Sequence, residues 1–507
     1  MDQWGQSRHA QWTGKVSSDQ QIRDAATQEA QQYQTWGAPT GYDAYGGYTL
    51  AWKETGTGYY RVVRRDGYWW LITPVGTPCF YFGLDSAPGT SEGTRATGRE
   101  YLFSWLPEKS GTYGSAWASN MFRFGVANLI RKYDSSTWSA KARDNTVTRM
   151  KYWGFSGVGK WSGDIQRPVP RVQVLKRDGV PTLGNGTNAS AGHPDIFDPA
   201  VRTTFHDKLA AAITPASDPD LLIGWSLGNE HEEIILTGEI STILAKGATV
   251  PAKLALVDHA LDRIYGGDLA RMGTAWKVTG SPLTRQSFYA ATAAQPPAAD
   301  IETLRRFFAE EYYKFIYTTV KALDPNHLYM GFWIVFNWWE NEEDWRLMTR
   351  YVDVIGFDRY AFTYDNAQVQ RLFGEADKPA ILGEFSFAQH YSAARGFGST
   401  TGSATDEAHA AALYEKWTEA AARDPYLIGQ MWFQYRDQPI TGRDDTAKDQ
   451  LVLGESLAFG LVDITDRPKW PLVTSIRRAN LKAAAQRLEA RDILQAEGAT
   501  KFGAVTA

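Results

Sequence analysis

The sequence lacks most of the residues and patterns that disulfide-rich, metal-dependent or membrane-spanning proteins need. Cys79 is the single cysteine in 507 residues, which excludes an intrachain disulfide and a cysteine-based zinc site. The longest apolar stretch, residues 328–336, is far too short to cross a bilayer. No HExxH or EF-hand spacing occurs, so we expect no catalytic metal and no other cofactor.

An excess of positive charge is also missing, since 57 Asp and Glu outnumber 53 Lys and Arg. The net charge is −4, so the chain has no basic surface of the kind that attracts nucleic acid or anionic lipid, and we expect neither partner. The first twelve residues, MDQWGQSRHAQW, contain no apolar run typical of a secretory signal. A single cysteine suits the cytosol and equally a secreted bacterial enzyme; we expect a secreted or periplasmic protein. The oligomeric state is left open.

Aromatic residues, by contrast, are abundant. The chain has 20 Trp, 25 Tyr and 23 Phe, and 43% of its residues are hydrophobic, enough for a large core. Most large aromatic side chains fill cores. Their flat apolar faces with a polar edge are also the usual platforms for sugar rings, so this composition is consistent with a carbohydrate-binding protein.

Strand-like and helix-like segments alternate along most of the chain. We expect an N-terminal extension over residues 1–76, with a β-hairpin around Asp66-Gly67, an alternating region over 77–494 and a loose tail over 495–507. The expected strands are 78–84, 154–161, 171–175, 221–227, 328–336, 352–357, 380–383 and 427–433. Eight strands alternating with helices favour an α/β fold of the (β/α)₈ TIM barrel type.

Three connections are too long for simple strand-to-helix turns. They cover residues 85 to about 139, 176–198, and 231 to about 300. Each follows the carboxyl end of an expected strand, and that face is where parallel barrels build their sites. We therefore expect long loops around a functional site at the C-terminal face of the barrel.

Two expected strands each end in a glutamate. LLIGWSLGNE, residues 221–230, ends in Glu230, and PAILGEF, residues 379–385, contains Glu384. Retaining glycosidases use one carboxyl group as acid/base and a second, about 5–5.5 Å away, as nucleophile. We predict that Glu230 is the acid/base and Glu384 the nucleophile. The acids at 232–233 are expected to be solvated loop charges.

Further candidates lie at the ends of other expected strands. Asp85 and Asp358 could orient a neighbouring group or hydrogen-bond sugar hydroxyls. Trp161, Trp338 and Trp339 are placed where a ring could stack on a sugar.

An Asn-Glu pair after strand four and a Glu after strand seven make the sequence similar to clan A of the glycoside hydrolases. The resemblance covers about residues 61–482. It implies that Asn229 contacts a sugar 2-hydroxyl, that Tyr360 touches the nucleophile, and that Trp432 forms the floor of the subsite at the cleavage point.

Several segments resemble one branch of this clan, the β-agarase-like enzymes. They are RRDGYWWLITPVGTPCF (64–80), GREYLFSWLP (98–107), PDIFDP (194–199), DPNHLYMG (324–331) and FGLVDITDRPKW (459–470). Phe332-Trp333 departs from the pattern, because an arginine is expected soon after HLYMG. The resemblance implies retaining hydrolysis of an agarose- or carrageenan-like galactan, while the departure leaves another β-glycan, such as a mannan, a glucan or an exo-β-galactosidase substrate, as the alternative.

Two rival interpretations belong to other classes. GWSLG, residues 224–228, matches the GxSxG motif of serine esterases, with Ser226 as nucleophile. That motif needs a sharp turn into a helix at the serine, yet the apolar run continues to Leu227. A non-catalytic sugar-binding barrel is the second rival, and it requires that one of the two glutamates points away from the site.

Overall fold

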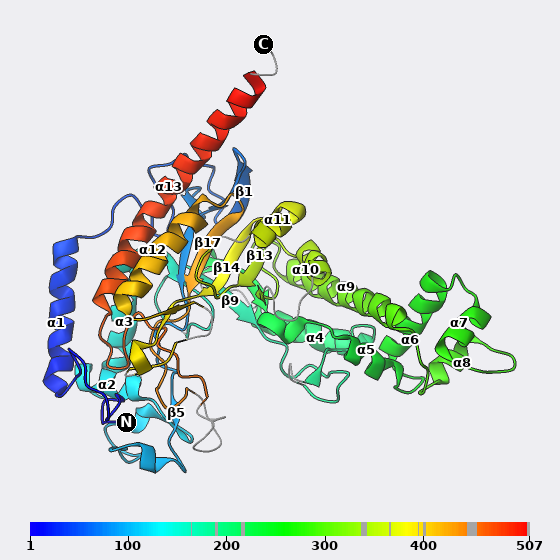
Figure 1. Ribbon diagram of the computed structural model, residues 1–507, viewed down its shortest axis with the longest axis horizontal. Coiled ribbons are helices and arrows are strands. Elements are labelled where there is room, and N and C mark those ends of the chain that lie inside the picture. The colour runs from blue at the N-terminus through cyan, green and yellow to red at the C-terminus, as the bar shows by residue number, and fades with distance from the viewer. Residues whose placement is uncertain are drawn as a thin grey trace.

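The computed structural model describes residues 1–163, 165–187, 191–213, 218–335, 342–364, 367–393, 395–398, 402–443 and 454–503. Within these residues, nine strands form one curled sheet in the order β11-β10-β9-β8-β4-β17-β14-β13-β12, and all neighbouring strands run parallel (Figure 1). Their bounds are β4 Tyr81–Leu84, β8 Gly157–Val158, β9 Arg171–Leu175, β10 Leu222–Leu227, β11 Leu328–Tyr329, β12 Ile334–Val335, β13 Ile355–Asp358, β14 Ala380–Phe385 and β17 Leu427–Trp432. The predicted α/β class with a parallel sheet is confirmed.

The two edge strands of this sheet, β11 and β12, replace the single strand predicted over 328–336. The strand is interrupted because Gly331 (φ 76°) and Trp333 (φ 53°) have left-handed backbone, which an extended strand cannot contain. Apolar sequence alone gave no sign of this break.

The residues between β11 and β12 still hydrogen-bond on both sides. The Met330 N–H donates to the Trp225 carbonyl at 2.8 Å, and the Met330 carbonyl accepts from the Gly356 N–H at 2.9 Å. The first bond joins the segment to β10 and the second joins it to β13. The same short stretch of chain thus links the two edges of the sheet.

Smaller corrections concern the first two predicted strands. Residues 78–84 form two strands, because β3 (Pro78–Cys79) pairs antiparallel with β2 and β4 enters the parallel sheet. The second strand shrinks from 154–161 to Gly157–Val158, since Gly154 caps the preceding helix in left-handed conformation and Trp161 has φ 57°.

The remaining strands lie outside the main sheet. They are β1 Arg61–Arg65, β2 Tyr68–Ile72, β5 Thr94–Arg95, β6 Trp117–Ala118, β7 Met121–Phe122, β15 Ala388–Gln389 and β16 Ser403–Ala404. β1 and β2 pair antiparallel across Asp66 (φ 55°) and Gly67 (φ 82°). Two successive positive φ values are what a tight two-residue hairpin turn requires.

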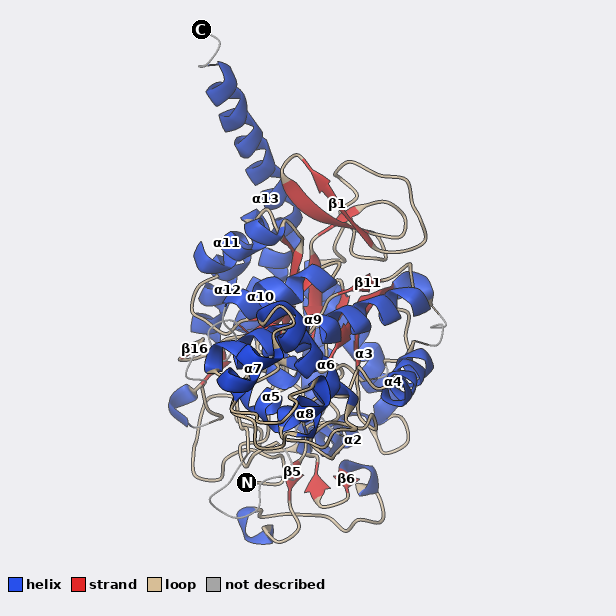
Figure 2. Ribbon diagram, turned by 90° about the vertical axis from the view of Figure 1, so that its right-hand side faces the viewer, coloured by secondary structure: helices blue, strands red, loops and turns tan. Residues whose placement is uncertain are grey.

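Helices cover the sheet on its outer side (Figures 1 and 2). They are α1 Asp19–Trp36, α2 Phe124–Tyr133, α3 Trp138–Trp153, α4 Pro199–Ala212, α5 Thr237–Leu244, α6 Pro251–His259, α7 Leu269–Trp276, α8 Arg285–Ala290, α9 Ala298–Leu323, α10 Glu342–Met348, α11 Ala367–Ala376, α12 Glu407–Arg423 and α13 Trp470–Gly503. Among the described residues, no helix combines the length and apolar character that a membrane crossing requires.

The helix ends follow from local sequence. At the start of α4, Asp198 accepts a hydrogen bond from the Ala200 N–H, and Pro199 takes the first helical position. α13 continues beyond the predicted end at residue 494 and reaches Gly503. Residues 495–503 are therefore helical, not the loose tail that was expected.

The long connection predicted over 231–300 contains α5, α6, α7 and α8. In Figure 1 this helical arm extends away from the sheet, with α7 and α8 farthest from it. The arm starts directly behind Glu230, so its first residues border the site.

The interior of the curled sheet is filled by inward-pointing side chains of the strands. Tyr81, Val172, Ile223, Ile381 and Ile428 belong to one buried cluster, each from a different strand. A second, larger cluster lies between the sheet and the helices. Because side chains alternate along a strand, the two clusters occupy opposite faces of the sheet.

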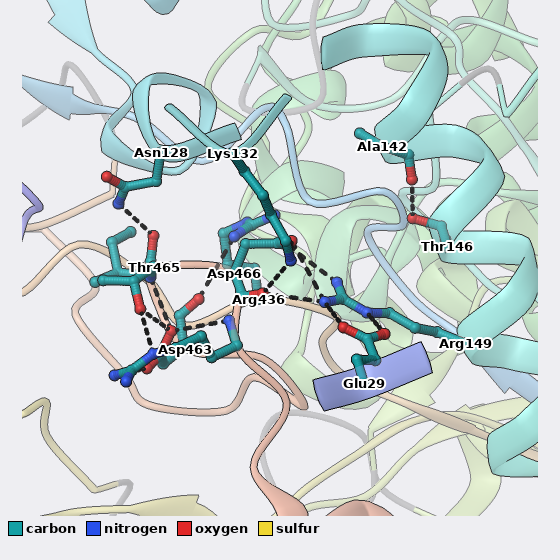
Figure 3. A network of polar contacts seen from close by, with 12 residues as sticks. Glu29, Asn128, Lys132, Ala142, Thr146, Arg149, Arg436, Asp463, Thr465 and Asp466 are labelled. Atoms are coloured by element: carbon teal, nitrogen blue, oxygen red, sulfur yellow. Dashed lines mark hydrogen bonds and ion pairs between the residues drawn. The ribbon is translucent and has the colours of Figure 1, made fainter. Parts of the chain in front are cut away.

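A buried ionic network joins the N-terminal helices to the FGLVDITDRPKW segment (Figure 3). Asp466 lies 2.8 Å from Lys132 Nζ, 3.0 Å from Arg149 Nη1 and 2.8 Å from Arg436 Nη2. Arg149 also contacts Glu29 of α1 at 2.7 Å. This network ties α1, α2 and α3 to the loop that precedes α13.

Candidate active site

Glu384 lies on β14 and is 5% exposed. Three side chains contact its carboxylate. The Tyr360 hydroxyl donates to Oε2 at 2.7 Å, the Trp161 indole N–H donates to Oε1 at 2.7 Å, and Lys160 Nζ lies 3.0 Å from Oε1. The predicted contact of Tyr360 with Glu384 is present.

Glu230 is held by an unusual backbone at the end of β10. It follows Gly228 (φ 63°), has φ 50° itself, and opens a short 3₁₀ helix, Glu230–Glu233. Its side chain is 26% exposed, and its Oε2 lies 3.8 Å from Nε2 of His231. A left-handed non-glycine residue is uncommon and turns this carboxyl group away from the direction that the strand would give it.

The structure brings the two predicted catalytic carboxylates together. One oxygen each of Glu230, Asp358 and Glu384 lie within 4.8 Å of one another. They come from the carboxyl ends of β10, β13 and β14, as the sequence predicted. Such a triad could also hold a metal ion, but the ammonium group of Lys160 already lies within hydrogen-bond distance of two of the three carboxylates.

Lys160 is a central site residue that sequence reasoning missed. It is 1% exposed, and its Nζ lies 2.6 Å from Asp358 Oδ2 and 2.8 Å from Asn229 Oδ1. Burial alone would lower the pKa of Lys160, but the negative charges of Asp358 and Glu384 outweigh burial and raise it, so the ammonium stays charged. A lysine ending the apolar run GVGK was the available signal.

Asp85 completes the base of the site from the end of β4. It is fully buried, and a Cβ added at Gly159 would lie 1.9 Å from its Oδ1. Burial, followed by the negative charge of Glu384, raises the pKa of Asp85 well above its usual range. Asp85 is therefore a buried acid close to Glu384 and Lys160 rather than an exposed sugar contact.

The predicted stacking residues lie in different places. Trp161 is 37% exposed and donates a hydrogen bond to Glu384, so it is a partly exposed aromatic residue at the site. Trp432 is 1% exposed and packs against Phe385 and Tyr414, because alternation along β17 turns it outward toward α12. The structure does not bring Trp432 to the carboxylates. Trp338 and Trp339 lie outside the described residues.

Glu233 does not fit the expectation of a solvated charge. It is fully buried, its Oε1 lies 2.9 Å from Arg177 Nε, and the Tyr312 hydroxyl donates to its other oxygen at 2.5 Å. Its neighbour Glu232 is exposed, as expected. Glu233 anchors the first turn behind the acid/base candidate to the loop that follows β9 and to α9.

The GxSxG interpretation is contradicted by the position of Ser226. This residue lies within β10, not at a turn into a helix, and is fully buried. Its hydroxyl accepts a hydrogen bond from the Trp333 indole N–H at 2.7 Å. Ser226 is a packing residue of the sheet interior.

A cavity of about 800 Å³ lies where the helical arm begins. His231 and Glu232 form one wall, Leu236 and Ile243 of the helical arm form another, and His193 contributes from the loop after β9. Such mixed polar and apolar walls are common in ligand sites.

Two curated proteins are similar to this chain over most of its length. No protein-family model matches the sequence. Beta-agarase B and Beta-agarase A of Vibrio sp. (strain JT0107) are each 26% identical to it, over 530 and 536 residues. The alignments cover 95% and 94% of this chain but 54% and 51% of the relatives, so the chain spans about half the length of the curated relatives it matches.

Solved structures show the same likeness. An exo-beta-agarase superposes with a TM-score of 0.81 at 23% identity, covering 96% of this chain and 73% of that one. At this identity the likeness shows the fold alone. The agarase AgWH50C superposes with a TM-score of 0.81 at 25% identity, covering 96% of this chain and 73% of that one. PfGH50B superposes with a TM-score of 0.81 at 25% identity, covering 96% of this chain and 74% of that one.

Both the sequence and the structure are thus similar to those of beta-agarases, which are glycoside hydrolases. This likeness confirms the β-agarase-like resemblance that the sequence motifs indicated.

Proposed function

We propose that this protein is a retaining glycoside hydrolase that cleaves a β-linked galactan of the agarose type. The observation that carries the proposal is the pair of carboxyl groups, Glu230 and Glu384, with oxygens within 4.8 Å of each other at the ends of parallel strands. Retaining enzymes place these groups about 5–5.5 Å apart, whereas inverting enzymes leave about 6.5–9.5 Å for a water molecule.

The proposed reaction has two displacements. Glu384 attacks the anomeric carbon while Glu230 gives its proton to the departing glycosidic oxygen, leaving a glycosyl-enzyme ester. Glu230, now a carboxylate, takes a proton from a water molecule, which attacks the same carbon and releases Glu384. Tyr360 and Trp161 hold the nucleophile by their hydrogen bonds, and Asn229 is proposed to contact the 2-hydroxyl.

The scaffold for this chemistry is proposed to be a closed (β/α)₈ barrel. Eight strands result if β11 and β12 count as one interrupted strand, and the bonds of Met330 to both of its neighbours support that count. The proposed division keeps residues 1–76 as an extension with the β1–β2 hairpin and residues 77–494 as the barrel. The proposed tail starts at residue 495, although α13 runs into it.

Two observations favour a galactan as substrate. The relatives are named beta-agarases. The departure at Phe332-Trp333 lies in the interior, because both residues are fully buried and Trp333 bonds to Ser226. It therefore does not alter the surface that a sugar would meet. Since a polymer of this kind cannot enter a cell intact, a secreted or periplasmic location is part of the proposal.

Product analysis by mass spectrometry tests the proposal. The protein is incubated with agarose, porphyran, carrageenans, unmodified galactan, mannan and cellulose, and Glu384→Gln serves as the blank. Products from galactans alone are expected, and their length separates exo from endo action. Products from mannan or cellulose would overturn the galactan assignment, and sugar binding without products would point to a non-catalytic barrel.

A further inference from the structure

We propose that Lys160 is the positioning residue of this site, a fixed internal cation that keeps the nucleophile Glu384 ionised and aligned and holds Asn229 beside the acid/base. This inference rests on the proposed function, since it assigns a role to Glu384. Lys160 follows β8, two residues after Val158, and lies one position past Gly159, where the chain passes directly over Asp85.

The hydrogen-bond geometry of Lys160 is the first support. Its ammonium group has three N–H donors, and three acceptors surround it: Asp358 at 2.6 Å, Asn229 at 2.8 Å and Glu384 at 3.0 Å. Asp358 and Glu384 lie in β13 and β14, and Asn229 lies two residues beyond the end of β10. One saturated ammonium group therefore sets the relative positions of three site residues.

The surroundings of the ammonium group are the second support. Its Nζ lies 4.7 Å from the ring centroid of Trp333 and 5.7 Å from that of Trp161, within the range of cation–π attraction. A buried lysine without partners is costly and tends to lose its proton. Here carboxylates and ring faces together stabilise the charged form.

The charge balance is the third support. The carboxylates of Glu384 and Asp358 are both buried, and one oxygen of each lies within 4.8 Å of the other. Burial, followed by the negative charges of Glu384 and Glu230, raises the pKa of Asp358 well above its usual range, although the charge of Lys160 opposes this. A nucleophile must be ionised to attack, and the Lys160 ammonium group, 3.0 Å from Glu384, supplies the positive charge that favours its ionised form.

A purely structural ion pair would look different. It would need one partner, whereas Lys160 also contacts Glu384 and Asn229, the two residues that are proposed to meet the reacting sugar. Removing the charge of Lys160 should therefore change both the magnitude of the rate and its dependence on pH.

The test compares Lys160→Met, which keeps length but loses charge, with Lys160→Arg, which keeps charge. Lys208→Met, at an exposed position of α4, is the matched control. For Lys160→Met we expect kcat on a galactan oligosaccharide to fall about 100-fold or more, as for misplaced catalytic groups. The acidic limb of the pH profile of kcat/KM should move to higher pH by about one unit or more. Lys160→Arg should keep the limb near its original position.

A second readout needs neither turnover nor the correct substrate. Carbodiimide labelling of Glu384, quantified by peptide mass spectrometry across pH, reports when this carboxyl group becomes protonated. The half-labelling pH should rise in Lys160→Met and stay unchanged in Lys208→Met. An unchanged half-labelling pH in folded Lys160→Met overturns the role of Lys160, whether or not the enzyme cleaves galactans.

If Lys160→Met does not fold, Lys160→Gln is labelled instead, with the same two outcomes. Absence of galactan products from the unaltered protein overturns only the proposed function.

Discussion

Single residues around Glu384 decide what this site can do, and the Tyr360 hydroxyl is the simplest to remove. Tyr360→Phe loses a hydrogen bond to a carboxylate, an interaction that contributes about 1.5–3 kcal/mol. We expect kcat/KM to fall about 10- to 100-fold, since 1.4 kcal/mol corresponds to a factor of ten. Tyr364→Phe, which loses a bond to Asp424 away from the site, is the control and should leave kcat/KM unchanged. An equal loss in both variants would contradict a role for Tyr360 in holding the nucleophile.

Trp161 combines two functions that can be separated by substitution. Trp161→Phe keeps an aromatic face but loses the N–H that donates to Glu384, so we expect kcat to fall about tenfold with little change in KM. Trp161→Ala also removes the exposed ring and should raise KM, because the sugar platform is lost. Steady-state kinetics of both variants check this. Identical KM values would show that the ring does not bind the sugar.

At the level of residues, the sequence correctly indicated that Glu230 and Glu384 lie close together. This could be predicted because each comes at the end of an apolar run that ends abruptly. Glu233 was misjudged because its partner, Arg177, is 56 residues away in the chain and no local pattern reveals the pair. Lys160 was missed for the same reason, since its three acceptors come from distant strands.

Among the structural elements, the connection of the N-terminal helices to the sheet depends on one buried carboxylate. Asp466 contacts three cations, and Asp466→Asn leaves them without their counter-charge. We expect the free energy of unfolding at pH 7 to fall by about 3–5 kcal/mol, measured by urea denaturation. Asp207→Asn, at an exposed position, should change it little. A small effect of Asp466→Asn would mean that the network is dispensable.

The same carboxylate gives a pH dependence of stability with a definite sign. Burial alone would raise the pKa of Asp466, but Arg149, Lys132 and Arg436 outweigh burial and lower it far below its usual range. A lowered folded-state pKa stabilises the fold above the unfolded value of about 3.9, and this stabilisation is lost as the pH falls through the folded-state pKa. The stability difference between the unaltered protein and Asp466→Asn should therefore shrink as the pH falls below about 4. A difference that grows on acidification would contradict this assignment.

Strand β14 carries a packing constraint next to the nucleophile. A Cβ at Gly383 would lie 2.3 Å from Cε3 of Trp333 and 2.6 Å from Asp358 Oδ1. We expect Gly383→Ala to destabilise the protein by about 1–3 kcal/mol through overpacking, measured as a lower denaturation midpoint. The space in front of Gly383 is thus filled by the buried ring of Trp333. Unchanged stability would show that Trp333 can move aside.

At the scale of elements, the sequence predicted strand positions well wherever hydrophobic pattern alone determines them. The predicted strand 171–175 matches β9 in full. The interruption between β11 and β12 could not be predicted, because it depends on the left-handed backbone of Trp333, whose side chain is held by Ser226 in a neighbouring strand.

For the molecule as a whole, alternating strands and helices were enough to predict a parallel α/β fold with its site at the strand ends. That pattern did not determine how many strands the sheet contains or where the two ends of the chain lie in the fold. The proposed catalysis with retention depends on the folded molecule as a whole, because the two glutamates come from opposite halves of the alternating region.

The most direct measurement is ¹H NMR of the anomeric signals during the first minutes of hydrolysis of a neutral galactan oligosaccharide. Retention requires the β-anomer of the new reducing end to appear first, with the α-anomer growing later by mutarotation. Glu384→Gln should give neither signal at comparable enzyme concentration. If the α-anomer appears first, the reaction inverts configuration, and the assignment of Glu384 as a covalent nucleophile is wrong.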